Sequence, residues 1–168
     1  QAFVTALRVL EGEQQAAAWL RAIQANRPRV YSNNAAAVEA VSRGEIDVAF
    51  VNHYYLYRFL AEHGDAFPVR NHYLKGDAGS IVNVAGVGIL NTSNRKEAAL
   101  RFVEFMLSER AQQHFARDTY EYPVVKDLGI EIDSRLLPLE EIETPDIDLN
   151  DLYDLEGTLE LLQRVGVL

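Results

Sequence analysis

The sequence has no cysteine among its 168 residues, and it has only one methionine and one tryptophan. The lack of cysteine excludes disulfide bonds, thiolate-ligated zinc or iron–sulfur centres, and cysteine nucleophiles. Long apolar runs are also missing, because the longest candidate, residues 81–90, contains Asn83 and two glycines. A membrane-spanning helix needs about 20 consecutive apolar residues, and this stretch falls well short of that length.

The motifs of the common enzyme classes are absent as well. The sequence has no phosphate-binding loop and no nucleophile elbow, and Gly86-Val87-Gly88 lacks the third glycine of a dinucleotide-binding fingerprint. The four histidines include no i, i+4 pair of the kind that binds zinc on a helix. We therefore expect a protein that is not an enzyme, with a tyrosine-based acid–base site as the alternative.

The charge is negative overall and unevenly distributed. The formal net charge is −9, and residues 76–168 hold eighteen acidic residues against eight basic ones. Such a chain has no electrostatic reason to bind nucleic acid or an anionic membrane surface, so neither partner is expected. We interpret the acidic stretch after Lys126 as a solvated segment, with an acidic docking segment as the alternative.

Apolar residues make up 48% of the chain, which is enough to form a core. Their spacing is helical over much of the sequence, with short apolar, partly β-branched runs between. Helices alternating with such runs predict an α/β fold with at least a partly parallel sheet. Helices are expected on both sides of Gly12 and at residues 35–41, 54–63, 95–107, 108–117 and 155–165, and strands at residues 46–51, 69–73 and 81–90.

The segment Gly44 to Arg58 carries the most chemical information. A buried strand is predicted to end at Val51, and phenol side chains follow at once in Tyr54 and Tyr55, where a helix begins. Ligands in open α/β sheets bind outside the carboxyl ends of the strands. Phenolate oxygen is a hard ligand that suits a hard, highly charged cation such as Fe(III). Tyrosines of amphipathic helices are usually half-buried packing residues, and that is the alternative interpretation of the pair.

The string Asn52-His53-Tyr54-Tyr55-Leu56-Tyr57-Arg58, with residues 43–51 before it, resembles the tyrosine-dyad motif of ferric-ion-binding periplasmic proteins. These proteins are the substrate-binding subunits of iron(III) ABC transporters. Looser matches extend the resemblance to nearly all 168 residues, at residues 16–26, 31–41, 79–88, 98–112 and 121–124.

The resemblance implies a type II-like periplasmic-binding-protein fold of two lobes, here incomplete. Residues 1–84 would be a second-lobe segment that carries the Tyr-Tyr motif. Residues 85–135 would return to the first lobe, and residues 136–168 would pack back on the second. Members of the family are about twice as long, so the chain is expected to be a C-terminal part. Apolar surface around residues 86–133 would then be exposed, or covered by the missing N-terminal half or by a homo-oligomer of the fragment.

The resemblance also implies the cargo and its ligands. Fe(III) would bind in the interlobe cleft through Tyr54 and Tyr55, with a synergistic anion such as phosphate or carbonate. By motif, Asn52 and Asn34 would bind that anion, and the alternative role of Asn34 is to cap the helix that follows it. A His and a Glu of the absent first lobe would supply further ligands. His53 is expected to lie outside the ligand set.

The implied setting is the periplasm or the extracellular space, with an ABC permease of the inner membrane as the partner. The truncated chain is expected not to be a complete binder. A binding protein of the same fold for another small anionic or organic solute is the alternative function.

Overall fold

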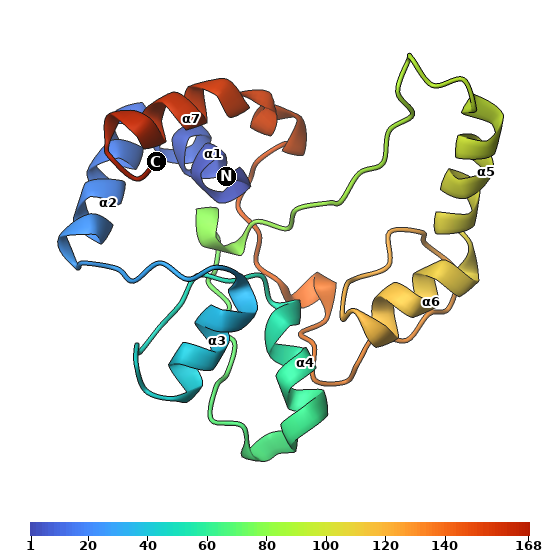
Figure 1. Cartoon of the computed structure of the whole chain (residues 1–168), viewed down its shortest axis with the longest axis horizontal. Helices are drawn as coiled ribbons and strands as arrows, with labels where there is room; N and C mark the ends of the chain where they lie inside the picture. The colour runs from blue at the N-terminus through green and yellow to red at the C-terminus, as the bar shows by residue number, and fades with distance from the viewer. The chain divides into compact units, whose positions relative to one another are not determined.

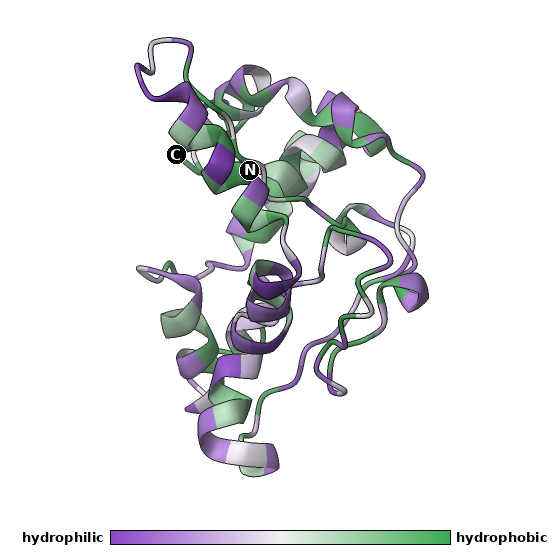
Figure 2. Ribbon diagram, turned by 90° about the vertical axis from the view of Figure 1, so that its right-hand side faces the viewer, coloured by the Kyte–Doolittle hydropathy of each residue, from purple (hydrophilic) through white to green (hydrophobic).

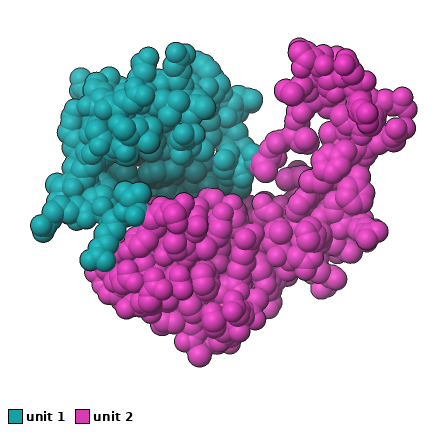
Figure 3. All heavy atoms as spheres, in the orientation of Figure 1, with its two compact units in different colours: residues 1–30, 72–84, 140–168 teal, residues 31–71, 85–139 magenta.

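A computed structural model describes all 168 residues as helices joined by extended segments and turns (Figure 1). The chain forms two compact units (Figure 3): unit 1 comprises residues 1–30, 72–84 and 140–168, and unit 2 comprises residues 31–71 and 85–139. The α-helices are α1 (Ala2–Glu11), α2 (Glu13–Ala25), α3 (Asn34–Ser42), α4 (Tyr54–His63), α5 (Lys96–Met106), α6 (Glu109–Asp118) and α7 (Leu155–Arg164). Four short 3-10 helices join them: η1 (Gly64–Ala66), η2 (Ala78–Ser80), η3 (Leu139–Glu141) and η4 (Leu149–Tyr153).

Unit 1 is built from the two ends of the chain and the internal segment 72–84. Helices α1 and α2 meet at Gly12, whose φ of +84° favours glycine, so the predicted division of the two helices is confirmed. Helix α7 contacts α1, and the core of the unit draws on α1, α2, α7 and η2. Its buried apolar residues are Val4, Ala6, Leu7, Ala16, Ala17, Leu20, Ala78, Leu161 and Leu162.

Polar groups join the same two helices inside unit 1. The hydroxyls of Thr5 and Thr158 are buried and 2.8 Å apart. The Arg8 guanidinium donates to the Asp154 carboxylate at 2.9 Å and to the Glu13 carboxylate at 2.6 Å. Each hydrogen bond pairs a group that burial would otherwise leave unsatisfied, so the network fixes how α1 and α7 pack.

Unit 2 contains α3 to α6 and a core that is rich in aromatic side chains. Its buried members are Val38, Leu56, Tyr57, Leu60, Phe67, Tyr120 and Leu136. Helix α4 ends at Gly64, with a φ of +67°, as the sequence predicted. Because Leu56 and Leu60 are one turn apart and both buried, they fix the rotation of α4 about its axis.

The three predicted strands are wrong as elements of a sheet. Residues 46–51, 69–73 and 81–90 run between helices and do not form strands. No backbone hydrogen bond pairs them into a ladder. A strand is stabilised by a neighbour that accepts and donates along its length, and these segments have none among the 168 residues. Their composition correctly predicted an extended backbone. It could not predict whether a neighbouring strand is present to pair with them.

Helix α5 is amphipathic, yet none of its residues is buried. Apolar and polar residues alternate along the helices, as the bands of green and purple in Figure 2 show. Exposed apolar residues on and beside α5 and in the segment before it are Val87, Ile89, Leu90, Leu100, Phe102, Phe105 and Leu107. The exposed apolar surface expected in this part of the chain is therefore present.

None of the helices combines the length and the apolar character that crossing a lipid bilayer requires. The assignment of residues 1–84, 85–135 and 136–168 to lobes of a larger fold stays a prediction.

Candidate functional site

The candidate site is the first turn of α4, in unit 2. Residues 52 and 53 lead into the helix, and Tyr54 and Tyr55 are its first two residues. Both phenol side chains are partly buried, because the inward face of the helix is occupied by Leu56 and Leu60. The core of unit 2 therefore sets the direction in which the two tyrosines leave the helix.

The two rings lie against each other. Their centroids are 4.8 Å apart and their planes meet at 34°. The Arg58 guanidinium lies over both rings, 5.3 Å from the centroid of Tyr55 and 5.9 Å from that of Tyr54. A cation at this distance from an aromatic face is attracted by the ring quadrupole. Arg58 stands four residues after Tyr54 and three after Tyr55, which is the spacing at which helical side chains meet.

The predicted asparagines join Tyr54 in a chain of hydrogen bonds. Asn52 Nδ2 donates to Tyr54 Oη at 2.9 Å, and the Asn52 backbone N–H donates to Asn34 Oδ1 at 3.2 Å. The side chain of Asn33, not Asn34, caps α3, because Asn33 Oδ1 accepts from the Ala36 N–H at 2.9 Å. The structure therefore brings Asn34, Asn52, Tyr54 and Tyr55 together, and Asn34 is not the helix cap.

The surroundings of Tyr54 favour its neutral phenol in the absence of a metal ion. Burial raises the pKa of Tyr54 above its ordinary value, and the hydrogen bond from Asn52 opposes that rise without overcoming it. The carboxylate of Glu121 and the neighbouring Tyr55 add to the rise of the pKa. A metal ion that binds here must therefore displace protons from the phenols.

The Nε2 atom of His53 already has a partner in the protein. That atom lies 2.9 Å from the carbonyl oxygen of Tyr120. Burial lowers the pKa of the imidazole below its ordinary value, which favours the neutral form. The expectation that His53 is not a metal ligand stays a prediction.

Two aromatic residues near the site serve packing. Tyr57 is buried, its ring stacks on that of Tyr120 with centroids 5.7 Å apart, and its hydroxyl donates to the Arg135 carbonyl oxygen. Tyr120 itself has a φ of +60°, which is uncommon for a residue with a side chain. Sequence reasoning did not identify Tyr120 as the partner of His53, since no local pattern signals a left-handed tyrosine.

The candidate site alone offers few groups that could bind a metal ion. No group of three or more His, Asp or Glu residues is placed to bind a metal ion. The tyrosine pair offers two phenol oxygens, which are hard donors suited to a hard trivalent cation. Two oxygens fill only part of a coordination sphere, so a metal bound here needs further ligands.

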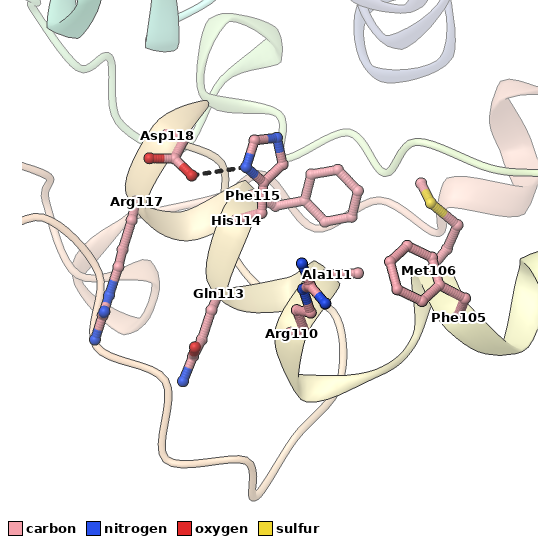
Figure 4. Close-up of a pocket in the computed structure, with 9 residues that line it drawn as sticks. All are labelled: Phe105, Met106, Arg110, Ala111, Gln113, His114, Phe115, Arg117 and Asp118. Carbon is pink, nitrogen blue, oxygen red and sulfur yellow. Dashed lines mark hydrogen bonds and ion pairs between the residues drawn. The ribbon is translucent and has the colours of Figure 1, made fainter.

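A second surface feature lies on α5 and α6 and is separate from the tyrosine pair. Phe105, Met106 and Phe115 gather on one side of this hollow, while Gln113 and Arg117 point the other way (Figure 4). His114 Nδ1 lies 2.6 Å from Asp118 Oδ2. The hollow is open and contains no predicted site residue. Its lining is Phe105, Met106, Arg110, Ala111, Gln113, His114, Phe115, Arg117 and Asp118.

Known proteins similar to this chain include iron-binding proteins of bacteria. It is 33% identical to "Iron uptake protein A1" of Synechocystis sp., over 90% of this chain and 44% of that protein. It is 29% identical to the "Fe(3+)-binding periplasmic protein" of Serratia marcescens, over 100% of this chain and 49% of that protein. The chain therefore spans about half the length of the curated relatives it matches.

Among solved structures, the chain is similar to iron-bound HitA from Pseudomonas aeruginosa. The TM-score is 0.89 at 36% sequence identity, and the match covers 98% of this chain and 53% of that one. The predicted resemblance to ferric-ion-binding proteins is confirmed, and so is an incomplete type II periplasmic-binding-protein fold. The family model described as "Bacterial extracellular solute-binding protein" matches residues 1–121. The chain thus belongs to the bacterial extracellular solute-binding protein family.

Proposed function

We propose that this chain is part of the substrate-binding subunit of a periplasmic ABC importer that captures Fe(III). The observation that carries the proposal is the geometry of Tyr54 and Tyr55, whose rings lie 4.8 Å apart at the start of α4. The names of the relatives and of the solved structure, which specify iron, support the same cargo. An ABC permease of the inner membrane is the partner that would receive the ion.

The chemistry follows from the acidity of the phenols. A tyrosine loses its proton with a pKa near 10, and burial raises that of Tyr54 further. A strongly acidic trivalent cation displaces both protons near neutral pH, whereas a weakly acidic divalent cation does not. The hydrogen bond from Asn52 to Tyr54 Oη favours the phenolate once it forms, because an N–H donor is attracted more strongly to a charged oxygen.

A synergistic anion, phosphate or carbonate, would occupy the side of the ion next to Asn52 and Asn34. The Nδ2 groups of both residues are donors, and the hydrogen bond from the Asn52 backbone N–H to Asn34 Oδ1 holds the Asn34 side chain against the backbone of Asn52. Anions in proteins are commonly held by such neutral N–H donors. Exchange of Asn52 for Asp would place a negative charge beside the anion, and we expect it to weaken anion-dependent iron binding.

The remaining ligands would come from outside these 168 residues, which make up about half the length of the relatives. The proposal therefore assigns iron capture to the protein that includes the missing N-terminal half. A second copy of the 168-residue chain is a further partner that would cover the exposed apolar surface.

Ferric citrate titration of the protein, in the full length that its gene encodes, tests the assignment. We expect a visible tyrosinate-to-iron charge-transfer band that is lost in Tyr54→Phe and in Tyr55→Phe. Tyr153→Phe is the matched control, because Tyr153 is 86% exposed and belongs to unit 1. Iron binding by the double variant with the affinity of the parent would falsify the role of the pair.

Another solute is the second candidate. Phenol and amide groups also bind small anionic or organic molecules by hydrogen bonding and stacking. Parallel titrations with phosphate alone and with an aromatic cation separate the two functions. Binding of either solute without iron, together with no charge-transfer band on adding ferric citrate, would favour the alternative.

A further inference from the structure

His53 is held from two sides at the entrance to α4. Its imidazole Nε2 lies 2.9 Å from the Tyr120 carbonyl oxygen, and its own carbonyl oxygen accepts from Asn71 Nδ2 at 3.0 Å. Although His53 occupies the N-cap position, its side chain makes no capping hydrogen bond. The side chain and the carbonyl group of His53 therefore contact residues outside α4 and do not cap the helix.

The hydrogen bond to Tyr120 defines the protonation of the ring. A backbone carbonyl oxygen can only accept, so Nε2 must carry a hydrogen and donate it. In the neutral imidazole Nδ1 is then the unprotonated nitrogen. The Tyr120 carbonyl is directed to His53 by a left-handed backbone with a φ of +60°, a conformation that persists only where the surroundings hold it.

The imidazole ring held in this way touches the tyrosine pair. It meets the Tyr54 ring edge to face, with centroids 5.4 Å apart and an interplanar angle of 79°. The centroid of the imidazole also lies 5.3 Å from that of the Tyr122 ring. The Tyr54 ring is thus restrained by His53, while its hydroxyl is restrained by Asn52 and its face by Arg58.

We propose that His53 is a positioning residue for the Tyr54–Tyr55 pair. By donating Nε2–H to the Tyr120 carbonyl, it keeps its ring against Tyr54 and so fixes the direction of the phenol oxygens. His53 acts on the bound ion only through Tyr54 and is not itself a ligand. This role rests on the proposed function, since it concerns the orientation of ligands for iron.

The first test needs no iron. Long-range 1H–15N correlation spectra of the metal-free protein distinguish the two imidazole tautomers of His53. We expect the Nε2–H tautomer, with Nδ1 unprotonated. The Nδ1–H tautomer would remove the hydrogen bond to Tyr120 and overturn the proposal.

The second test separates the ring from its donor. His53→Phe keeps a flat ring and loses the N–H group, whereas His53→Gln keeps an amide donor and loses the ring. Loss of a residue that orients a metal ligand typically weakens metal affinity about 10- to 100-fold. We expect that loss in His53→Phe, with a shifted charge-transfer band, and partial rescue in His53→Gln. His72→Phe is the control, because His72 is exposed and lies in unit 1.

The two proposals fail in different ways. A parent protein with no charge-transfer band, or with a band that survives in the Tyr54→Phe, Tyr55→Phe double variant, contradicts the proposed function. A parent band that requires the tyrosines but is unchanged in energy and affinity in His53→Phe contradicts only the role of His53. Thermal unfolding of each variant, measured without iron, shows whether a loss of binding reflects a loss of folding instead.

Discussion

At the residue scale, two neighbouring asparagines of the same chemistry have different partners. Asn33 caps α3, while Asn34 accepts the N–H of Asn52, eighteen residues further along the chain. The sequence indicated the helix cap as the alternative role of Asn34, because asparagine is a favoured capping residue and Asn34 stands at the start of the helix. Which of Asn33 and Asn34 caps the helix depends on the contact of Asn34 with Asn52. A contact across eighteen residues cannot be predicted from the local sequence.

The division of roles between the asparagines can be measured. Asn33→Ala removes the cap, and we expect it to lower the free energy of unfolding by about 1 kcal/mol. Asn34→Ala leaves the cap in place and loses a hydrogen bond to an exposed backbone group, so its effect on unfolding should be smaller. Urea unfolding of both variants provides the comparison. A larger loss for Asn34→Ala than for Asn33→Ala would contradict the assignment of the cap.

The paired tyrosines show which features of the candidate site could be predicted from the sequence and which could not. Their position at a helix start was predictable from the pattern of Leu56, Phe59 and Leu60, and the structure confirms that helix. The contact of Arg58 with both rings follows from helical spacing, yet it was not predicted as a cation–π contact. The His53–Tyr120 contact spans 67 residues and needs an unusual backbone conformation, so only the three-dimensional structure could supply it.

At the scale of elements, helices were predictable and strands were not. A helix closes its hydrogen bonds within its own segment, so periodicity and an end signal such as Gly12 or Gly64 are enough to locate it. A strand depends on a neighbour elsewhere in the chain. Residues 46–51 and 81–90 have the composition of strands but lack paired neighbours here.

Helix α5 leads to a prediction about local stability. It contains no buried residue, whereas α4 has three, namely Leu56, Tyr57 and Leu60. A helix without tertiary packing opens at a small cost in free energy, so its amides exchange quickly. We expect hydrogen exchange to be faster in α5 than in α4. Equal protection that disappears on dilution would show that a second copy covers the exposed apolar face.

At the scale of the whole molecule, unit 1 depends on contacts between the first and the last helix. Arg8 and Asp154 are 146 positions apart in sequence and form one ion pair. The incomplete binding-protein fold was predicted from the resemblance rather than from periodicity, since long-range pairing of this kind leaves no periodic trace. The lobe boundaries remain predictions for the same reason.

This ion-pair network predicts a pH dependence of stability. The hydrogen bond from Arg8 holds the pKa of Glu13 below its ordinary value of 4.5, and the N–H of Gly157 together with Arg8 holds that of Asp154 below 3.8. Because the folded pKa values are the lower ones, the unfolded chain binds more protons as the pH falls. The stabilisation is therefore complete above the ordinary values and is lost below them.

Thermal unfolding between pH 7 and pH 3 measures this effect. We expect the midpoint to fall as the pH drops below about 4.5, the ordinary glutamate range. The fall should be modest, because both carboxylates are partly exposed and solvent screens the pairs. In Arg8→Gln the protein should be less stable at pH 7, and its midpoint should depend less on pH. An unchanged pH dependence in that variant would assign the effect to other carboxylates.

The rotation of α4 couples the interior of unit 2 to the face that carries the phenols. An inserted residue between Tyr55 and Leu56 would shift both tyrosines by one position relative to the core residues, a turn of about 100° around the helix. Leu56 and Leu60 would stay in the core. The inserted residue would then occupy the position of Tyr55 on the helix. Evolution of the binding face is therefore confined to substitutions at fixed spacing, because a change in length here would displace the phenols while the core residues stay in place.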